Sequence, residues 1–592
     1  MNLVVTLSLL AALKASPNYT ATPNYQNIPK QSPTHSEVAN ILPGDTPLVG
    51  FISTKVEDWK TLERFQLFKS AFAVAATLFP PNLPNQNLNY ESIINTTLGD
   101  KIALVMMPQV DSKKVSADAN FLMLAPIKDD RLLQPYLDSL KANKRQYKGV
   151  TILEWKSVRS KATTQQVLPD WMPKVASLPT IPVPAQVVKP KSTMPSLPDL
   201  KNKYEQSLAI ALLPGYIALA STATPLEQLI DTPSNNTLAQ NPNFQHTRKN
   251  PHFGRSLFTI YQNPTLFASR LNSLSKDPNS PFYLLGTGTI KPELFKEYKS
   301  IDGLIWVQPN GLQLQFNTYL RKPRTASNTL NANAELLAHI PAPNYSTLTG
   351  HNLQQQWQLI STAFNANPTL KDGLAKFYDS VQRTIKLDVE RDILAWMDGE
   401  YAFFSYPTKR GLFNSVQNKF NLNLGMGFLI QTSDRTAAET SLKKLDAAIK
   451  SFSKGEINIT NHNINSTRVT NWQVQQQSLF AYTWIDNKTL LITTGVEAIA
   501  ELLNHPRHLL AKDYNFTTAT NSLPHPNQGY FYMNMGSSLS WLYNLSPDSF
   551  NNQYFQIFKQ SIGSIYSISA TTSTHGNREQ SNALIVLAPT RK

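Results

Sequence analysis

The chain has 592 residues, 41% of them hydrophobic and 10% aromatic, so it is long enough for two or more domains with packed cores. It contains no cysteine, which excludes disulfides, thiolate metal sites, iron–sulfur clusters and cysteine nucleophiles. Its formal net charge is +15, and no internal apolar run approaches the roughly 18 residues that a membrane-spanning helix needs.

The first 40 residues have the composition of a targeting segment and a tether. Residues 1–16 begin with MNLVVTLSLLAAL and predict a signal or anchor segment, and residues 17–40 are rich in Pro, Asn, Thr and Ser, as flexible tethers are. No Lys or Arg precedes the apolar run, so the signal is weak or truncated. The alternative is a buried first helix or strand. Export would place the protein in a periplasm or thylakoid lumen, in contact with or close to a membrane.

Apolar periodicity predicts the elements of the first half. The helical spacing of Trp59, Leu62, Phe65 and Phe68 predicts an amphipathic helix over 56–78, with the tryptophan as a core anchor. Further predicted helices lie at 90–98, 128–143 and 225–231. Strands are predicted at 46–54, 101–107, 120–126, 207–213, 216–222, 253–261 and 303–319.

A second copy of this pattern follows in the second half. The stretch from Leu42 to Trp59 corresponds to that from Ile340 to Trp357, and residues 89–108 lie without gaps over 388–407. The numbering offset is 305 at the helix predicted over 435–449 and 272 at the matching LAQNPNF and LAKDYNF segments, so the first half has 33 more residues between these points. We interpret this as a domain duplication.

The extra residues form a basic, proline-rich arm at 168–203. Eight prolines lie between positions 168 and 198, and twelve Lys and Arg stand against three acidic residues between positions 141 and 203. The predicted domains are therefore 41–322, which contains the arm, and 339–592, joined by a polar linker at 323–338.

Few helices and many consecutive strands favour an α+β fold: two tandem duplicated domains, each a mainly antiparallel sheet with a few amphipathic helices. The proline-containing opening strand LPGDTPLVGFIST, the tryptophan-bearing helix and the Gly-Asp turn at Gly99-Asp100 resemble the bacterial, mostly cyanobacterial family known as domain of unknown function 3352. The resemblance covers most of the chain from Leu42 to Pro589. It implies an exported or membrane-anchored protein and offers no catalytic residue.

Motifs for chemistry are lacking. His505 and His508 are separated by a proline and do not have the spacing of a zinc hydrolase, and no GxSxG elbow occurs. Glu91 and Glu390 recur in both copies without a second carboxylate for acid–base work. The sequence thus predicts no catalytic residue, no metal ligand and no cofactor.

The basic stretch is the one candidate binding region. Its cations are typical of contact with an anionic membrane surface, although a Pro-rich arm is equally suited to docking on an envelope protein or to serving as a solvated linker. Nucleic acid is disfavoured because export would separate the protein from it. The candidate contact residues are Lys141, Lys144, Arg145, Lys148, Lys156, Arg159, Lys161, Lys174, Lys189 and Lys191.

These patterns favour a non-enzymatic binding or scaffold protein near a membrane. The alternatives are an envelope hydrolase whose site is assembled only in three dimensions, which requires clustered polar groups in a cleft, and a carrier of an apolar ligand, which requires a large apolar pocket between helices and sheet.

Overall fold

The structure is a computed structural model that describes residues 37–68, 98–109, 121–128, 142–156, 207–275, 292–323, 334–365, 368–409, 423–503, 508–545 and 562–590. The predicted signal segment, most of the tether and the basic arm lie outside the described residues.

The first half contributes ten strands to the described fold. They are β1 (Leu48–Ser53), β2 (Lys101–Met106), β3 (Phe121–Pro126), β4 (Asn143–Tyr147), β5 (Val150–Lys156), β6 (Ser207–Leu213), β7 (Tyr216–Ala220), β8 (Phe258–Gln262), β9 (Tyr298–Gln308) and β10 (Gly311–Leu320). Its helices are η2 (Val38–Asn40), α2 (Val56–Lys60), η3 (Thr61–Arg64), α6 (Ala223–Ile230), η6 (Leu238–Gln240), α7 (Pro242–Arg248), α8 (Pro264–Ser275) and η8 (Pro292–Phe295).

The second half contributes ten more strands. They are β11 (Ser346–His351), β12 (Glu400–Tyr406), β13 (Gly425–Gln431), β14 (Ile457–Ile464), β15 (Thr467–Val474), β16 (Gln477–Trp484), β17 (Thr489–Thr493), β18 (Tyr530–Asn534), β19 (Ile565–His575) and β20 (Arg578–Leu587). Its helices are α9 (Ala334–Leu337), α10 (Leu353–Asn365), α11 (Pro368–Ile385), the π-helical η9 (Val389–Leu394), α13 (Arg435–Phe452), α14 (Val496–Leu503), η10 (Leu510–Lys512), α15 (Tyr514–Thr520) and α16 (Met535–Leu545).

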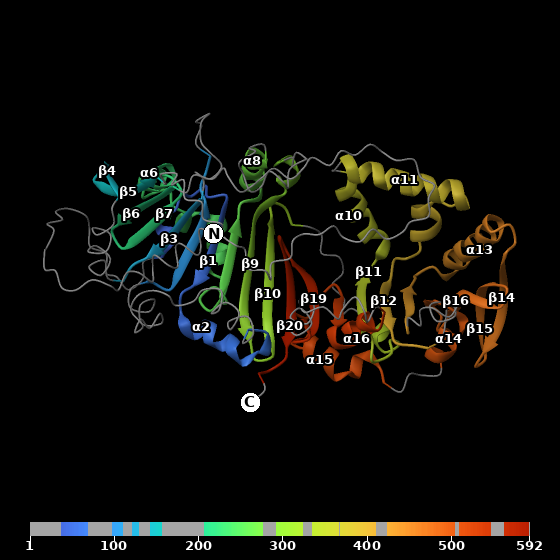
Figure 1. The fold of residues 1–592 in the computed structure, drawn as a ribbon. Helices are drawn as coiled ribbons and strands as arrows, with labels where there is room; N and C mark the ends of the chain where they lie inside the picture. Colours follow the sequence, from blue (N-terminus) through green and yellow to red (C-terminus); the bar gives the residue numbers. More distant parts are fainter. Residues whose placement is uncertain are drawn as a thin grey trace, which may run out of the picture.

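All twenty strands belong to one antiparallel sheet. Following the pairings from one end to the other gives the order β4-β5-β6-β7-β3-β2-β1-β8-β9-β10-β20-β19-β18-β11-β12-β13-β17-β16-β15-β14. Figure 1 shows β9, β10 and β20 upright in the middle, with β4 and β14 at the two ends. The α+β class and the antiparallel sheet predicted from the sequence are confirmed.

The two halves have the same strand order, read outward from the centre. Their registers also agree with the numbering offsets found in the sequence: Val49 pairs with Val105 and Thr347 pairs with Phe404, at offsets of 298 and 299. The segments η6 and η10 are 272 positions apart. The predicted domain boundaries stay predictions, because one sheet runs through both halves.

The halves join edge to edge where β10 pairs with β20. Nine residue pairs form this ladder, and at its middle Gln315 lies opposite Asn582. The Gln315 Nε2 donates a hydrogen bond to the Asn582 Oδ1 over 3.2 Å, and both side chains are buried. The junction is therefore made of backbone hydrogen bonds with a polar pair at its centre.

The first predicted helix is interrupted at Phe65, and the chain is helical again from Gln66 to Phe68. Helix α2 begins at Val56 as predicted, but η3 follows it, and Phe65 is extended and forms an isolated bridge with Pro589 near the end of the chain. Leu62 and Phe65 are buried, whereas Trp59 is only half-buried. Residues 69–97 lie outside the described part, so the rest of the prediction is untested there.

The sequence patterns also missed elements of the fold. The helix predicted over 128–143 ends too late, because Asn143 begins β4. The hairpins β4–β5 and β14–β15 were not predicted, since β4 and β14 are largely polar and lack a buried apolar side. Helix α11 was also missed.

Candidate functional site

A continuous row of apolar side chains crosses the middle of the sheet on one face. Register places each of its members directly opposite the next, over eleven strands from β2 to β13. The row consists of Ile102, Ile52, Phe258, Ile305, Leu314, Ala583, Ala570, Phe531, Leu348, Phe403 and Phe428. With strands about 4.8 Å apart, it extends over roughly 48 Å. We call the face that carries this row the open face.

None of the eleven side chains is fully buried. Leu348, Phe403 and Phe531, which are cross-strand neighbours, are 46%, 38% and 36% exposed. Phe316 and Leu104 on the same face are 46% and 39% exposed. Large exposed apolar surfaces of this kind mark interaction sites in soluble proteins.

The opposite face of the four central strands is buried and carries many polar residues beside apolar ones such as Leu304, Trp306 and Leu584. We call it the covered face, and its buried polar residues on β9, β10, β19 and β20 are Ser300, Asp302, Gln313, Gln315, Asn317, Ser567, Ser569, Thr571, Ser573 and Asn582. Side chains alternate between the two faces of a strand, so along each strand these residues alternate with residues of the open face. The centre of the sheet thus has an unusually polar covered face, while its other face carries the exposed apolar row.

Helices α7 and α15 supply partners for this polar layer. The Thr247 hydroxyl of α7 donates to the Asp302 Oδ2 over 2.9 Å, and the Asn317 Nδ2 donates to the Oδ1 over 2.6 Å. The Ser569 hydroxyl donates to the Ala519 carbonyl of α15 over 2.5 Å. Burial raises the pKa of Asp302, and the hydrogen bonds from Asn317 and Thr247 oppose that effect.

Away from the centre, the covered face is an ordinary apolar core. In the first half Phe51, Phe244 and Tyr261 pack together, with the Phe244 and Tyr261 ring centroids 5.2 Å apart. In the second half Phe404, Phe516 and Tyr532 belong to a matching cluster. These two clusters hold the sheet from its covered face.

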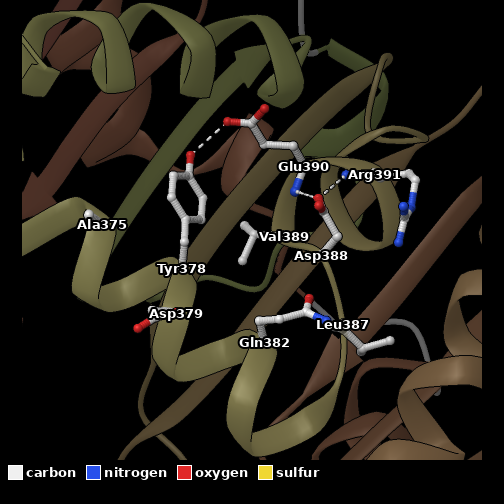
Figure 2. Close-up of a pocket in the computed structure, with 9 residues that line it drawn as sticks. All are labelled: Ala375, Tyr378, Asp379, Gln382, Leu387, Asp388, Val389, Glu390 and Arg391. Carbon is white, nitrogen blue, oxygen red and sulfur yellow. Dashed lines mark hydrogen bonds between the residues drawn. The ribbon is translucent and has the colours of Figure 1, made fainter.

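A pocket of about 710 Å³ lies beside α11 and η9. Figure 2 shows Tyr378 pointing at Glu390, and its hydroxyl donates to the Glu390 Oε1 over 2.7 Å. The Trp357 Nε1 donates to the same hydroxyl over 2.8 Å. Asp388 accepts hydrogen bonds from the backbone N–H groups of Glu390 and Arg391, at 3.0 and 2.8 Å. Each of these groups is engaged in holding α10, α11 and η9 together.

One serine and one lysine have the separation of a nucleophile and its base. The Lys101 Nζ lies 3.0 Å from the Ser256 Oγ, and burial lowers the pKa of Lys101 to about 8. However, Ser256 is completely buried and its hydroxyl donates to the Phe253 carbonyl over 2.9 Å. No substrate reaches that oxygen, so the pair stabilises the fold and does not support the hydrolase alternative.

Within the described ranges, no three His, Asp or Glu side chains gather in a way that would hold a metal ion. Among the helices that are described, none is both long and apolar enough to cross a membrane.

Three of the ten predicted anionic-surface residues have described side chains. Arg145 forms ion pairs with Glu154 and Glu227, and Lys148 pairs with Asp231 at 2.6 Å. Lys144 lies on β4 directly before Arg145. Lys156 ends β5, and the other six residues lie outside the described part of the chain. The open face was not predicted from the sequence, because alternation in a strand does not say which side helices will cover.

The model of the family described as "Protein of unknown function (DUF3352)" matches residues 3–587. The chain belongs to the DUF3352 family. The resemblance seen in the opening strand, the tryptophan helix and the Gly-Asp turn is thereby confirmed. The sequence of this DUF3352 protein matches no curated protein.

Three crystal forms of TP0453 show a distant likeness to this DUF3352 chain. Form III has 6% sequence identity and a TM-score of 0.23, and the match covers 50% of this chain and 83% of TP0453. Form IV has 7% sequence identity and a TM-score of 0.21, and the match covers 48% of this chain and 79% of TP0453. Form I has 10% sequence identity and a TM-score of 0.20, and the match covers 44% of this chain and 94% of TP0453. At these TM-scores the likeness supports no conclusion on fold or function.

Proposed function

We propose that this DUF3352 protein is a non-enzymatic binding protein that holds the acyl chains of a lipid on the open face of its sheet. The observation that carries the proposal is the apolar row on the open face, whose neighbouring members Leu348, Phe403 and Phe531 are exposed while many polar residues are buried on the covered face. Leaving that row in water costs free energy in proportion to its exposed area, roughly 25 cal/mol per Å², and an apolar ligand would recover it.

The shape and charge of the protein favour lipid over a small ligand. The row is long and narrow, and it has no charged member, so an extended hydrocarbon chain fits its dimensions. The net charge of +15 is complementary to an anionic headgroup. Export to a periplasm or lumen, with the predicted anchor segment near a membrane, would bring the open face to such lipids.

The two halves support a related proposal about origin. Their equal strand order and the agreement of register with the sequence offsets are what a tandem duplication of a ten-strand unit would leave. Joining the copies through β10 and β20 would then have doubled the length of the open face.

A binding assay tests the function. The protein is titrated with a fluorescent long-chain fatty acid and, separately, with phosphatidylglycerol vesicles. We expect the triple variant Leu348→Ser, Phe403→Ser, Phe531→Ser to weaken fatty-acid binding roughly a hundredfold, since each substitution removes about 1 kcal/mol of apolar contact.

The matched control is the double variant Phe452→Ser, Tyr514→Ser. These side chains are 57% and 78% exposed and lie on α13 and α15, away from the row. The control should bind like the parent protein. Parent protein that binds no fatty acid, or a triple variant that binds as tightly as the parent, would show that the open face is not a lipid site.

A further inference from the structure

The two ends of the sheet are protected to different degrees. Strand β14 has eight residues, and each is paired with β15 in a ladder without a bulge. Among the described residues β14 has no second neighbour, so half of its backbone N–H and C=O groups point away from β15. Figure 1 shows β14 at the extremity of the molecule.

Strand β14 has none of the usual edge protection. Its sequence, INITNHNI, contains no Lys, Arg, Asp, Glu or Pro. The equivalent edge in the first half, β4, is only five residues long and carries Lys144 and Arg145, with Lys148 directly after it. Natural sheets block edge-to-edge pairing with charges, prolines, bulges or very short strands. A long, neutral, regular edge therefore indicates a pairing site.

We propose that β14 pairs antiparallel with β14 of a second copy, so that two molecules form a two-fold dimer with one continuous sheet. Centred between Thr460 and Asn461, this pairing puts Ile457 of one copy opposite Ile464 of the other, and Asn458 opposite Asn463. No like charges meet, because the strand has none. A strand that pairs with itself in this way gives a closed, isologous interface.

The charge distribution permits a second copy to approach at β14. Two molecules with a net charge of +15 repel each other, so they can approach only where the surface is neutral. The charged groups nearest β14 are of both signs, with Lys454 and Glu456 before the strand and Arg468 opposite Asn463 on β15. The chain already uses the same geometry once, since β10 and β20 join its halves edge to edge.

The test measures the mass of the full chain in solution. Sedimentation equilibrium over a wide range of protein concentration should show the 66.3 kDa chain in reversible equilibrium with a dimer. Asn458 and Asn463 are exposed and have no hydrogen bond through their side chains among the described contacts. The variant Asn458→Lys, Asn463→Lys places like charges opposite each other twice, and we expect the dimer dissociation constant to rise roughly tenfold.

Charge reversal makes the test specific. The variant Asn458→Glu, Asn463→Glu should also dimerise more weakly when alone, but an equimolar mixture of the Lys and Glu variants should form a heterodimer. The control, Asn235→Lys with Asn521→Lys, adds the same charge at exposed positions off the sheet edge and should dimerise like the parent protein. Circular dichroism confirms that all variants are folded.

Each outcome decides the proposal. A parent protein that stays monomeric at every concentration overturns it, as does a dimer that the Lys variant leaves intact, because that dimer uses another surface. Loss of the dimer in both charged variants without recovery in the mixture also overturns it. Loss followed by recovery supports the β14–β14 register.

Discussion

Two leucines, one on each face of the sheet, should contribute differently to the stability of the protein. Leu429 on β13 is completely buried in the second-half core, whereas Leu348 on β11 is 46% exposed in the apolar row. Truncating a fully buried leucine to alanine costs about 3 to 5 kcal/mol, because apolar contact is lost and a cavity is left. For Leu348 about half of the side chain already lies in water, so Leu348→Ala should cost about 1 kcal/mol or less.

Urea unfolding followed by tryptophan fluorescence measures both variants. We expect Leu429→Ala to lower the unfolding midpoint clearly and Leu348→Ala to lower it only slightly, with similar slopes for both. A long-chain fatty acid should then raise the midpoint of the parent protein, and of Leu429→Ala, more than that of Leu348→Ala, since a ligand that binds only the folded state stabilises it.

Equal losses of stability in the two variants would refute the assignment of faces, because they would mean that Leu348 is as thoroughly covered as Leu429. A fatty acid that stabilises Leu348→Ala as much as the parent protein would refute the role of this position in binding.

Three further predictions concern charges and backbone. The hydrogen bond from Arg391 lowers the pKa of Asp392. The ionised Asp392 carboxylate therefore stabilises the folded state above a pH of about 4, and this stabilisation is lost as the pH falls. Asp392→Asn should cost about 1 to 3 kcal/mol at neutral pH, and the difference should vanish in acid urea titrations. Burial raises the pKa of Asp302. The protonated Asp302 carboxyl therefore favours the folded state at low pH, and this contribution to the free energy of unfolding is lost as the pH rises above about 4. Asp302→Asn should remove that slope from the pH dependence of unfolding. At Gly529 (φ +126°) a Cβ would collide with a neighbouring backbone carbonyl, whereas at Gly149 (φ +83°) it meets open space. Thermal unfolding should therefore show a loss of roughly 3 kcal/mol or more for Gly529→Ala against about 1 kcal/mol for Gly149→Ala.

Much of the architecture follows from local patterns. The apolar run before Pro108 predicts β2, and the strands at 207–213 and 216–222 appear as β6 and β7 with closely similar bounds. These strands are buried, so their apolar residues are consecutive and easily recognised. By contrast, β4 and β14 are held by pairing with β5 and β15 and not by burial of their own side chains, and no local pattern marks them.

The helix predicted over 56–78 shows where local periodicity is overridden. Phe65 has the spacing of a helical core residue, yet it is extended and bridges to Pro589, more than five hundred positions later. The backbone N–H of Gln66 donates to the Ala588 carbonyl over 3.0 Å. A contact with the far end of the chain determines the conformation there, and it cannot be inferred from neighbouring residues.

The sequence by itself determined the family, the antiparallel α+β class and the correspondence between the halves. Alternation and turn residues are local properties, and numbering offsets can be found by comparing stretches of sequence directly. In β10, alternation places Gln313, Gln315 and Asn317 on one side and Leu312, Leu314 and Phe316 on the other. Only the tertiary structure decided which side is buried. Thr247 of α7 and the Ala519 carbonyl of α15 form hydrogen bonds with Asp302 and Ser569 on the covered side, and the apolar row on the other side is left exposed.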